Sequence, residues 1–331
     1  DMPTKPTLTA PDGRPIYNQS ESQFKTTKFG LYNVGGAQRE VVSFSLSKLF
    51  NDGDSSLTFG YTHQNIDMIC SMQSSTSHSN YGKCPASDFN NRVATRSIYE
   101  TEHRFFATLS STHYFFGADK PTTFNLFLER KSGLPGTLTF DTYSSPGRYK
   151  TQAFGYERRV NDDSAHLLYI PSGLDDPLVC WVSCSNPNNA VGSEILNLLY
   201  NTYGLERFKG RILPPGVFEF PWQTSLDLKI TQILPGFRDD DGFVVTLGIE
   251  NLLNLIDDEE GVIRYGDYTG KIDVFDFQLT SDYSKYIFGN SRGADYAFRY
   301  NPSNPYELRK SAVNSIWRAQ LGVTYKFSLS F

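Results

Sequence analysis

Histidines are the side chains of this sequence best suited to acid–base or metal chemistry, and the five are His63, His78, His103, His113 and His166. None stands in an HExxH motif, and no serine occupies a GxSxG turn. His103 and His113 share one face of a predicted strand. They are ten residues apart, which is about 33 Å along a strand and too far for a common site. We interpret the histidines as polar strand or interface residues and predict no catalytic residue, metal ligand or cofactor. A nucleophile and a base that meet across strands remain an open alternative.

Two acidic runs, 239–241 and 257–260, offer carboxylates for a divalent cation. Neither has the alternating ligands and late glutamate of an EF-hand loop. The first run is interpreted as a solvated turn. The second follows the end of a predicted strand, where ion binding stays open as an alternative to a solvated surface.

The four cysteines form two close pairs, Cys70 with Cys84 and Cys180 with Cys184, each in a segment rich in Ser, Asn, Gly and Pro. Neither pair has a histidine partner at the spacing of a zinc site. We therefore predict two loop-closing disulfides in an oxidising compartment. Four unpaired thiols are the alternative.

The composition limits the class of protein. A net charge of −5, from 36 acidic and 31 basic residues, argues against a nucleic-acid partner, which requires a clustered basic surface. No apolar run reaches the roughly 20 residues of a membrane-spanning helix. The mean hydropathy of −0.41 still permits a membrane barrel, where only alternate strand residues face lipid. The N-terminus lacks a signal peptide's apolar segment, so either a signal was removed or the chain continues a longer polypeptide.

Apolar and polar residues alternate with period two through most of the chain, which is typical of β-strands. The clearest alternation covers 42–46, 57–61, 105–109, 124–128, 218–230, 243–249 and 317–331, and weaker strands are expected at 150–160, 165–171, 261–279 and 285–290. We predict an all-β, antiparallel protein with about twelve strands. The one helix expected, 192–203 with Ser193 as its cap, should pack onto its own loop.

The connections between strands alternate in length. Short turns are expected at 51–54, 117–120, 161–164, 235–242 and 280–284, and long polar connections at 67–98, 172–216 and 291–313. If the last strand runs towards the periplasm, every short turn lies on the periplasmic side and every long connection outside. This sorting is typical of an up-and-down transmembrane β-barrel. Residues 1–331 are thus interpreted as a single barrel domain, or part of one, with three long external loops.

Blocks of sequence spread in order over nearly the whole chain resemble the C-terminal part of TonB-dependent outer-membrane receptors, closest to the Oar-like group. The blocks are PDGRPIY (11–17), HRF (103–105), ERKSGLP (129–135), LLYIPSGLDDP (167–177), FPWQTSLDLKITQILPGF (220–237), IENLLNLIDDEEG (249–261) and the terminal WRAQLGVTYKF. Together they are specific, although each block alone is weak.

The resemblance implies a receptor barrel of roughly 22 strands with an N-terminal plug. This chain has no recognisable plug and no TonB-contacting box, so it resembles about the C-terminal half of the barrel. The terminal aromatic positions Tyr325, Phe327, Leu329 and Phe331 resemble the signal read by the barrel-assembly machinery. The alternate positions Asp227, Lys229, Glu250, Gln320 and Thr324 would face the lumen.

The expected function is ligand capture by external loops and passage across the outer membrane of a Gram-negative bacterium. The partners implied are outer-membrane lipid, the barrel-assembly machinery, the missing plug and N-terminal strands, TonB through that plug, and a ligand that the sequence does not identify. Two alternatives stay open. One is a β-rich fragment, at the cell surface or released, that self-assembles through its open edges. The other is a soluble β-sandwich binding module.

Overall fold

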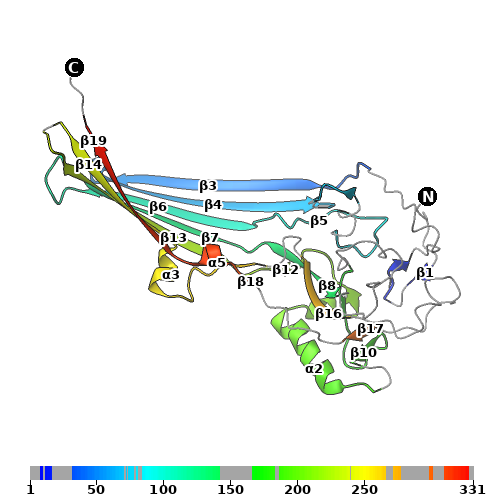
Figure 1. Cartoon of the computed structure of the whole chain (residues 1–331). Helices are drawn as coiled ribbons and strands as arrows, with labels where there is room; N and C mark the ends of the chain where they lie inside the picture. The colour runs from blue at the N-terminus through cyan, green and yellow to red at the C-terminus, as the bar shows by residue number, and fades with distance from the viewer. Residues whose placement is uncertain are drawn as a thin grey trace.

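The computed structural model describes residues 8–9, 12–16, 32–70, 72, 74–77, 80, 84–141, 166–182, 186–238, 240–265, 271–276, 298–300 and 309–327. These residues form two regions, a long curved β-sheet and a smaller lobe at one of its ends (Figure 1).

The sheet contains eight strands, seven of them in one continuous antiparallel path that follows chain order. These seven are β3 (Gln38–Phe50), β4 (Ser55–Met68), β6 (His103–His113), β7 (Thr122–Lys131), β13 (Gln223–Pro235), β14 (Gly242–Glu250) and β19 (Arg318–Lys326), and the short β5 (Thr95–Arg96) pairs with β4. The prediction of an antiparallel all-β architecture is therefore confirmed for the sheet. Among the strands described, none pairs with the outer edge of β3 or of β19, so the sheet is open.

The first hairpin shows how the sequence specifies the turns. Asn51, Asp52 and Gly53 form the 3₁₀ turn η2 (Asn51–Gly53), and all three have a positive φ, of 51°, 52° and 101°. Asn, Asp and Gly are the residues that tolerate this left-handed backbone, and they place β3 and β4 in direct antiparallel register. Short turns also join β6 to β7 and β13 to β14, so the predicted turns at 51–54, 117–120 and 235–242 are confirmed.

The turns and the long connections lie at opposite ends of the sheet. The three short turns lie at one end, together with the last residue of β19, Lys326, which pairs with Gly242. The long connections from β4 to β6, β7 to β13 and β14 to β19 all leave from the other end, where the lobe lies (Figure 1). The predicted sorting of connections by length is present in the described sheet.

The lobe contains the buried hydrophobic core. Its elements are β8 (Pro135–Asp141), β9 (Tyr169–Ile170), β10 (Val179–Trp181), α2 (Asn189–Asn197), the π-helical turn η3 (Leu198–Thr202), η4 (Glu206–Phe208), β11 (Arg211–Ile212), β12 (Phe218–Glu219), β16 (Lys271–Asp276) and β17 (Phe298–Tyr300). Thirteen buried residues make up the core: Leu138, Phe140, Leu168, Tyr169, Ile170, Val179, Trp181, Ile195, Leu196, Leu199, Leu205, Leu213 and Phe220. Most of the predicted loop 172–216 therefore folds into a packed unit.

Two of the weaker predicted strands join the lobe and not the sheet. The segment 165–171 supplies β9, and 261–279 supplies β16, which pairs with β8 in parallel; β10 and β17 are also parallel. This corrects the prediction of antiparallel pairing throughout. These strands are reached through long connections, which permit parallel pairing. The predicted strands 150–160 and 285–290 and the turns 161–164 and 280–284 lie outside the described residues.

Helix α2 begins earlier than predicted. Asn188 caps it, its side chain accepting a hydrogen bond from the Val191 N–H at 3.3 Å. Ser193, the predicted cap, lies inside the helix and donates its hydroxyl to the Asn189 carbonyl at 3.0 Å. The apolar stripe of the helix is buried against the lobe, as expected for a helix that packs onto its own loop. Gly192 permits this packing, since a Cβ there would lie 2.6 Å from the Trp181 ring.

A short N-terminal hairpin, β1 (Leu8–Thr9) with β2 (Pro15–Ile16), also contacts the lobe. Arg14 is almost completely buried, forms an ion pair with Asp12 at 2.7 Å and donates to the Leu167 carbonyl at 2.9 Å. Residues 12–16 of the PDGRPIY segment are thereby attached to β-structure more than 150 residues away.

Candidate functional site

One face of the sheet is apolar across all seven long strands. Residues opposite one another in an antiparallel pair lie on the same face, and on this face the pairing joins apolar side chains. The pairs include Phe44–Tyr61, Leu46–Phe59, Leu57–Leu109, Phe59–Ala107, Ala107–Leu128, Leu109–Leu126, Leu126–Leu228, Leu128–Leu226, Ile230–Leu247, Leu228–Ile249, Leu247–Leu321 and Val245–Val323. We call this surface the apolar face.

The apolar face is open to its surroundings. At the two edges of the sheet, Leu46 on β3 and Leu321 on β19 expose 63% and 69% of their surface. Soluble monomers rarely expose apolar patches above a few hundred Å². The rest of the described chain thus leaves this continuous apolar surface of seven strands uncovered.

Aromatic rings gather where the apolar face meets the long connections, a region we call the connection rim. Tyr61, His103 and Trp222 lie there, with the His103 and Trp222 rings stacked at 6.0 Å and an interplanar angle of 9°. The guanidinium of Arg130 lies 5.5 Å from the centre of the Trp222 ring.

A second aromatic group lies at the other end of the sheet and defines the turn rim. Phe237, Phe243 and Tyr325 form it, with ring centres 4.7 to 5.6 Å apart, and Phe327 stacks on Tyr325. On β6 the two ends are marked by His103 and His113, ten residues or about 33 Å apart along the strand.

The opposite face of the sheet is polar. Side-chain hydrogen bonds cross between strands on it: one joins the hydroxyls of Ser43 and Thr62 at 3.1 Å, and Arg104 donates another to Glu129 at 2.7 Å. Phe106 lies here over Gly60, whose missing side chain makes room for the ring, since a Cβ would stand 2.2 Å from it. We call this surface the polar face.

The five residues predicted to face a lumen all lie on the polar face. Directly paired residues share a face, and the pairs that show this are Glu250 with Arg318, and Gly248 with both Lys229 and Gln320. Asp227 shares this face and accepts a hydrogen bond from the Asn251 N–H at 2.8 Å. Thr324 pairs with Val244 on the same face.

Of the predicted assembly signal, Tyr325 and Phe327 belong to the turn rim, and Leu329 and Phe331 lie outside the described residues. The Tyr325 hydroxyl donates to the Asp241 carboxylate, which attaches the end of β19 to the β13–β14 turn.

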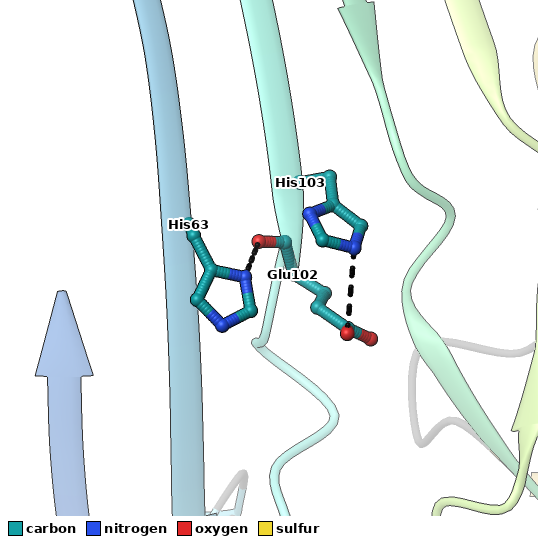
Figure 2. Close-up of side chains that lie close together, drawn as sticks. All are labelled: His63, Glu102 and His103. Atoms are coloured by element: carbon teal, nitrogen blue, oxygen red, sulfur yellow. Dashed lines mark hydrogen bonds and ion pairs between the residues drawn. The ribbon is translucent and has the colours of Figure 1, made fainter. Parts of the chain in front are cut away.

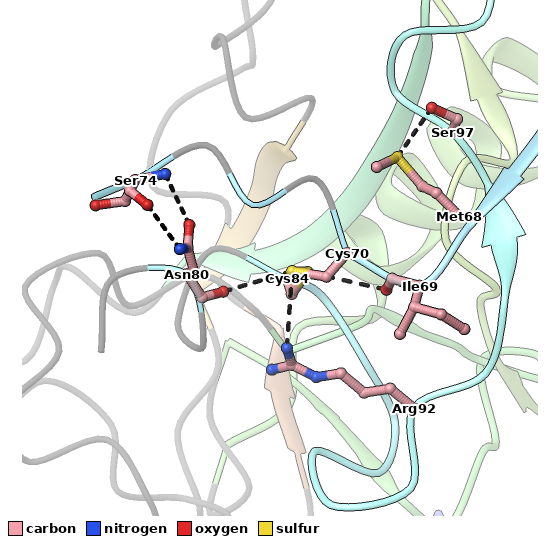
Figure 3. Close-up of a disulfide and its surroundings, with 8 residues drawn as sticks. All are labelled: Met68, Ile69, Cys70, Ser74, Asn80, Cys84, Arg92 and Ser97. Atoms are coloured by element: carbon pink, nitrogen blue, oxygen red, sulfur yellow. Dashed lines mark hydrogen bonds between the residues drawn. A yellow bond between two sulfur atoms is a disulfide. The ribbon is translucent and has the colours of Figure 1, made fainter. Parts of the chain in front are cut away.

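The disulfide between Cys70 and Cys84 is confirmed, with 5.6 Å between the two Cα atoms (Figure 3). It lies in the connection from β4 to β6, and the Arg92 guanidinium donates to Cys70 Sγ at 3.9 Å. Cys180 is also disulfide-bonded. Its predicted partner, Cys184, lies outside the described residues.

Of the two acidic runs, 257–260 forms a turn after the short helix α3 (Leu252–Ile256). The Asp257 carboxylate accepts from the Glu259 N–H at 3.0 Å, and the Asn254 amide donates to the carbonyls of Asp258 and Glu260. These contacts are those of a self-capped turn. In the other run, Asp239 lies outside the described residues.

Asn251, in the IENLLN block, connects both ends of the connection from β14 to β19. Its backbone is left-handed, with φ 54°, and its side-chain amide donates to the carbonyls of Gly261 and Ser315, each at 3.0 Å. The strands β15 (Arg264–Tyr265) and β18 (Arg309–Lys310) pair just beyond, next to the short helix α5 (Ala312–Ser315). We call this arrangement the neck.

The structure brings together two histidines that sequence reasoning left apart. His63 on β4 pairs directly with His103 on β6, beside Glu102 (Figure 2). A signal for this pairing is present in the sequence: if the apolar triads 57–61 and 105–109 face each other in antiparallel order, positions 63 and 103 must coincide. His113 lies at the other end of β6, His166 lies in the lobe, and His78 is outside the described residues.

Within the part of the chain that the structure describes, no helix is long and apolar enough to cross a membrane.

No protein-family model matches this chain, and neither a curated protein nor a solved structure matches it.

Proposed function

We propose that this chain is part of the β-barrel of an outer-membrane receptor of the TonB-dependent type, and that it contributes to ligand capture and passage across the outer membrane. The observation that carries the proposal is the apolar face: seven strands in up-and-down order present one continuous, exposed apolar surface with an aromatic rim at each end.

The height of the apolar face suits lipid. A strand segment of about 33 Å, tilted by about 40° as barrel strands are, spans a height of about 25 Å. This equals the apolar band of outer-membrane barrels, which aromatic girdles border on both sides. Trp, Tyr and Arg at the connection rim have the apolar body and polar end that suit such a boundary.

The sorting of connections supports the same orientation. Outer-membrane barrels have short periplasmic turns and long external loops. The end with short turns would then face the periplasm, and the long connections with the lobe would lie outside the cell. Two observations fit this placement: the lobe has its own buried core, and the connection from β4 to β6 is closed by a disulfide. Both favour an external surface that keeps its shape in an oxidising medium.

The open edges require further strands. Unpaired backbone groups in hydrocarbon cost several kcal/mol each, so β3 and β19 cannot remain unpaired in a membrane. The resemblance to receptor barrels of roughly 22 strands suggests the occupant, namely the remaining strands of the same receptor. The polar face, with Asp227 and Lys229 at its centre, would then line the lumen, and a plug carried outside this chain would couple transport to TonB.

The proposal is tested by placing a tryptophan on each face of one strand in the full receptor. In vesicles with brominated lipid chains, the fluorescence of Phe44→Trp should be quenched strongly. The neighbouring variant Ser45→Trp, which alternates to the polar face, is the matched control and should be quenched little. Equal quenching of the two variants, or recovery of the protein in the soluble fraction, would contradict a lipid-facing apolar face.

The open edges also favour a second candidate, a β-rich fragment that assembles edge to edge. β3 offers thirteen residues and β19 offers nine for pairing with another copy. Electron microscopy separates the two candidates: extended assemblies support self-association, and isolated barrels in detergent eliminate it. A soluble sandwich would need a second sheet over the apolar face, and the described residues supply none.

A further inference from the structure

We propose that His63, Glu102 and His103 bind a divalent transition-metal ion of the zinc type at the connection rim. This site goes beyond the proposed transport function and does not depend on it. It also departs from the sequence, which predicts no metal ligand.

The three side chains converge because of the strand register. His63 and His103 are directly paired on neighbouring strands, and their ring centres are 5.1 Å apart. Glu102 immediately precedes β6, and its Oε1 lies 3.4 Å from His103 Nε2 (Figure 2). One potential ligand atom from each residue lies within 4.8 Å of the other two.

Neighbouring groups orient two of the ligands. The Tyr61 hydroxyl forms a hydrogen bond with His103 Nδ1 at 2.9 Å, and His103 Nε2 is then directed towards Glu102. Arg96 donates to Glu102 Oε2 at 2.6 Å and leaves Oε1 for a metal ion. Such partners hold ligands in place in known metal sites, where a histidine bonds through its second nitrogen. The stacked Trp222 ring restricts the His103 ring further.

The charge around the site favours a cation. Arg96 contacts three carboxylates, those of Glu100, Glu102 and Glu219, at 2.5, 2.6 and 3.0 Å. Within this group of one guanidinium and three carboxylates the excess charge is negative, and Arg130, 5.5 Å from the Trp222 ring, offsets part of it. Glu102 and His103 are each 35% exposed, so an ion can reach them from solvent.

The ligands must close slightly on binding. Zinc bonds of about 2.0 to 2.1 Å in tetrahedral geometry place the ligand atoms about 3.3 Å apart. His63 Nδ1 now lies 3.1 Å from the Glu102 carbonyl oxygen, and rotation of this half-buried ring brings a nitrogen towards the other two ligands.

The ligand set selects the kind of metal. Two imidazoles and one carboxylate suit Zn²⁺ and its neighbours, whereas Ca²⁺ and Mg²⁺ require oxygen ligands. Three protein ligands leave one position open for water or another group. A bound ion would attach the end of β4 to the start of β6 and so fix both ends of the disulfide-containing connection between them.

The test measures Zn²⁺ uptake by the full chain in detergent micelles. Equilibrium dialysis with metal analysis should show a single Zn²⁺ per chain. His63→Ala and His103→Ala should each weaken binding by more than about 100-fold, and Tyr61→Phe by about tenfold, since a supporting partner contributes less than a ligand. His113→Ala is the matched control: it lies at the other end of β6 and should leave affinity unchanged.

Co²⁺ supplies a spectroscopic check, because its absorption reports the coordinating atoms. His63→Cys keeps a ligand at this position, so it should retain Co²⁺ binding and add a thiolate band that the native chain lacks. A variant that fails to fold would lose binding without such a band. The proposal is overturned if the native chain takes up no Zn²⁺, if His63→Ala and His103→Ala bind as the native chain does, or if His113→Ala loses as much.

Discussion

Phe140 and Leu199 in the lobe are completely buried, whereas Phe44 and Leu321 on the sheet expose 57% and 69% of their surface. Both regions are rich in apolar residues, but only the lobe encloses them. The lobe therefore encloses its apolar side chains, whereas the sheet leaves one apolar face exposed. The two regions should respond differently to the same kind of substitution.

The largest effect is expected in the lobe. Phe140→Ala should destabilise the lobe by about 3 to 5 kcal/mol, because it removes a fully buried ring and leaves a cavity. Urea unfolding is monitored through the fluorescence of Trp181, in a protein whose Trp222 and Trp317 are replaced by Phe. Phe44→Ala, the same change on the apolar face, is the control and should leave the lobe transition in place. A similar shift in both variants would remove the distinction between the regions.

A charge on the apolar face tests the environment of the sheet. Leu46 lies about midway between the rims, where an arginine facing lipid costs about 2 to 4 kcal/mol. If the apolar face meets lipid as proposed, Leu46→Arg should lower the folded fraction in lipid vesicles, measured by the heat-dependent gel mobility of the protein. Ser47→Arg on the next residue, on the polar face, should have a much smaller effect. A well-tolerated Leu46→Arg would mean that this face meets water.

A smaller effect is expected on the polar face. Gly60→Ala places a methyl group against the Phe106 ring, and overpacking of this kind costs about 1 to 3 kcal/mol. In a Phe106→Ala background the same substitution should cost much less, because the obstructing ring is gone. Urea unfolding of the sheet in detergent measures both variants. If the double variant lost as much stability as the two single variants together, the contact between residue 60 and the Phe106 ring would be excluded as the cause of the Gly60→Ala effect.

The smallest expected effect is a change in the stability of the lobe with pH, which again distinguishes the lobe from the sheet. Burial raises the pKa of Tyr200 in the lobe to about 12. The pKa of Tyr169 is also raised, mainly by burial and secondly by the negative charge of Asp176. The folded lobe favours the neutral form of both phenols. Their contribution to the free energy of unfolding is therefore complete below about pH 10, the pKa of an unfolded tyrosine, and is lost as the pH rises from there towards the higher pKa of the folded state. Trp181 fluorescence should report this loss of lobe stability between about pH 10 and 12.

Tyr200→Phe supplies the control for the pH prediction. It removes one titrating phenol, so the lobe of this variant should lose less stability over the same alkaline range. A lobe whose stability is constant up to pH 12, or a variant with an unchanged pH profile, would contradict the assignment.

The sequence predicts the sheet well and the lobe poorly, for physical reasons. Long strands with one apolar face carry a period of two, and the Asn51–Gly53 turn sets the register of the first hairpin. The lobe strands are mostly two or three residues long and lie in continuous apolar runs such as 167–170, which show no alternation. Their parallel pairing depends on contacts between distant segments, which no local pattern encodes.

The candidate sites show the same limit. The disulfide between Cys70 and Cys84 was predictable because its residues are close in sequence. The pairing of His63 with His103 depends on the register of two strands joined by a long connection, which no turn fixes. Matching the apolar triads of the two strands would have revealed it. The position of each predicted lumen residue on one face follows from alternation alone.

The neck changes the effective topology of the long chain segment that separates the neighbouring strands β14 and β19. Asn251 bonds to Gly261 and Ser315, and Ser311 donates to the Ile263 carbonyl at 2.9 Å, so both ends of this segment are joined beside the sheet. Loop-closure entropy then depends on the short path through the neck and not on the residues between Tyr265 and Arg309. A change in the length of that excursion therefore costs the pairing of β14 with β19 little, provided that β16 and β17 keep their places in the lobe. The neck thus lets the register of β14 and β19 be set independently of the excursion, which is constrained instead by its two lobe strands, β16 and β17.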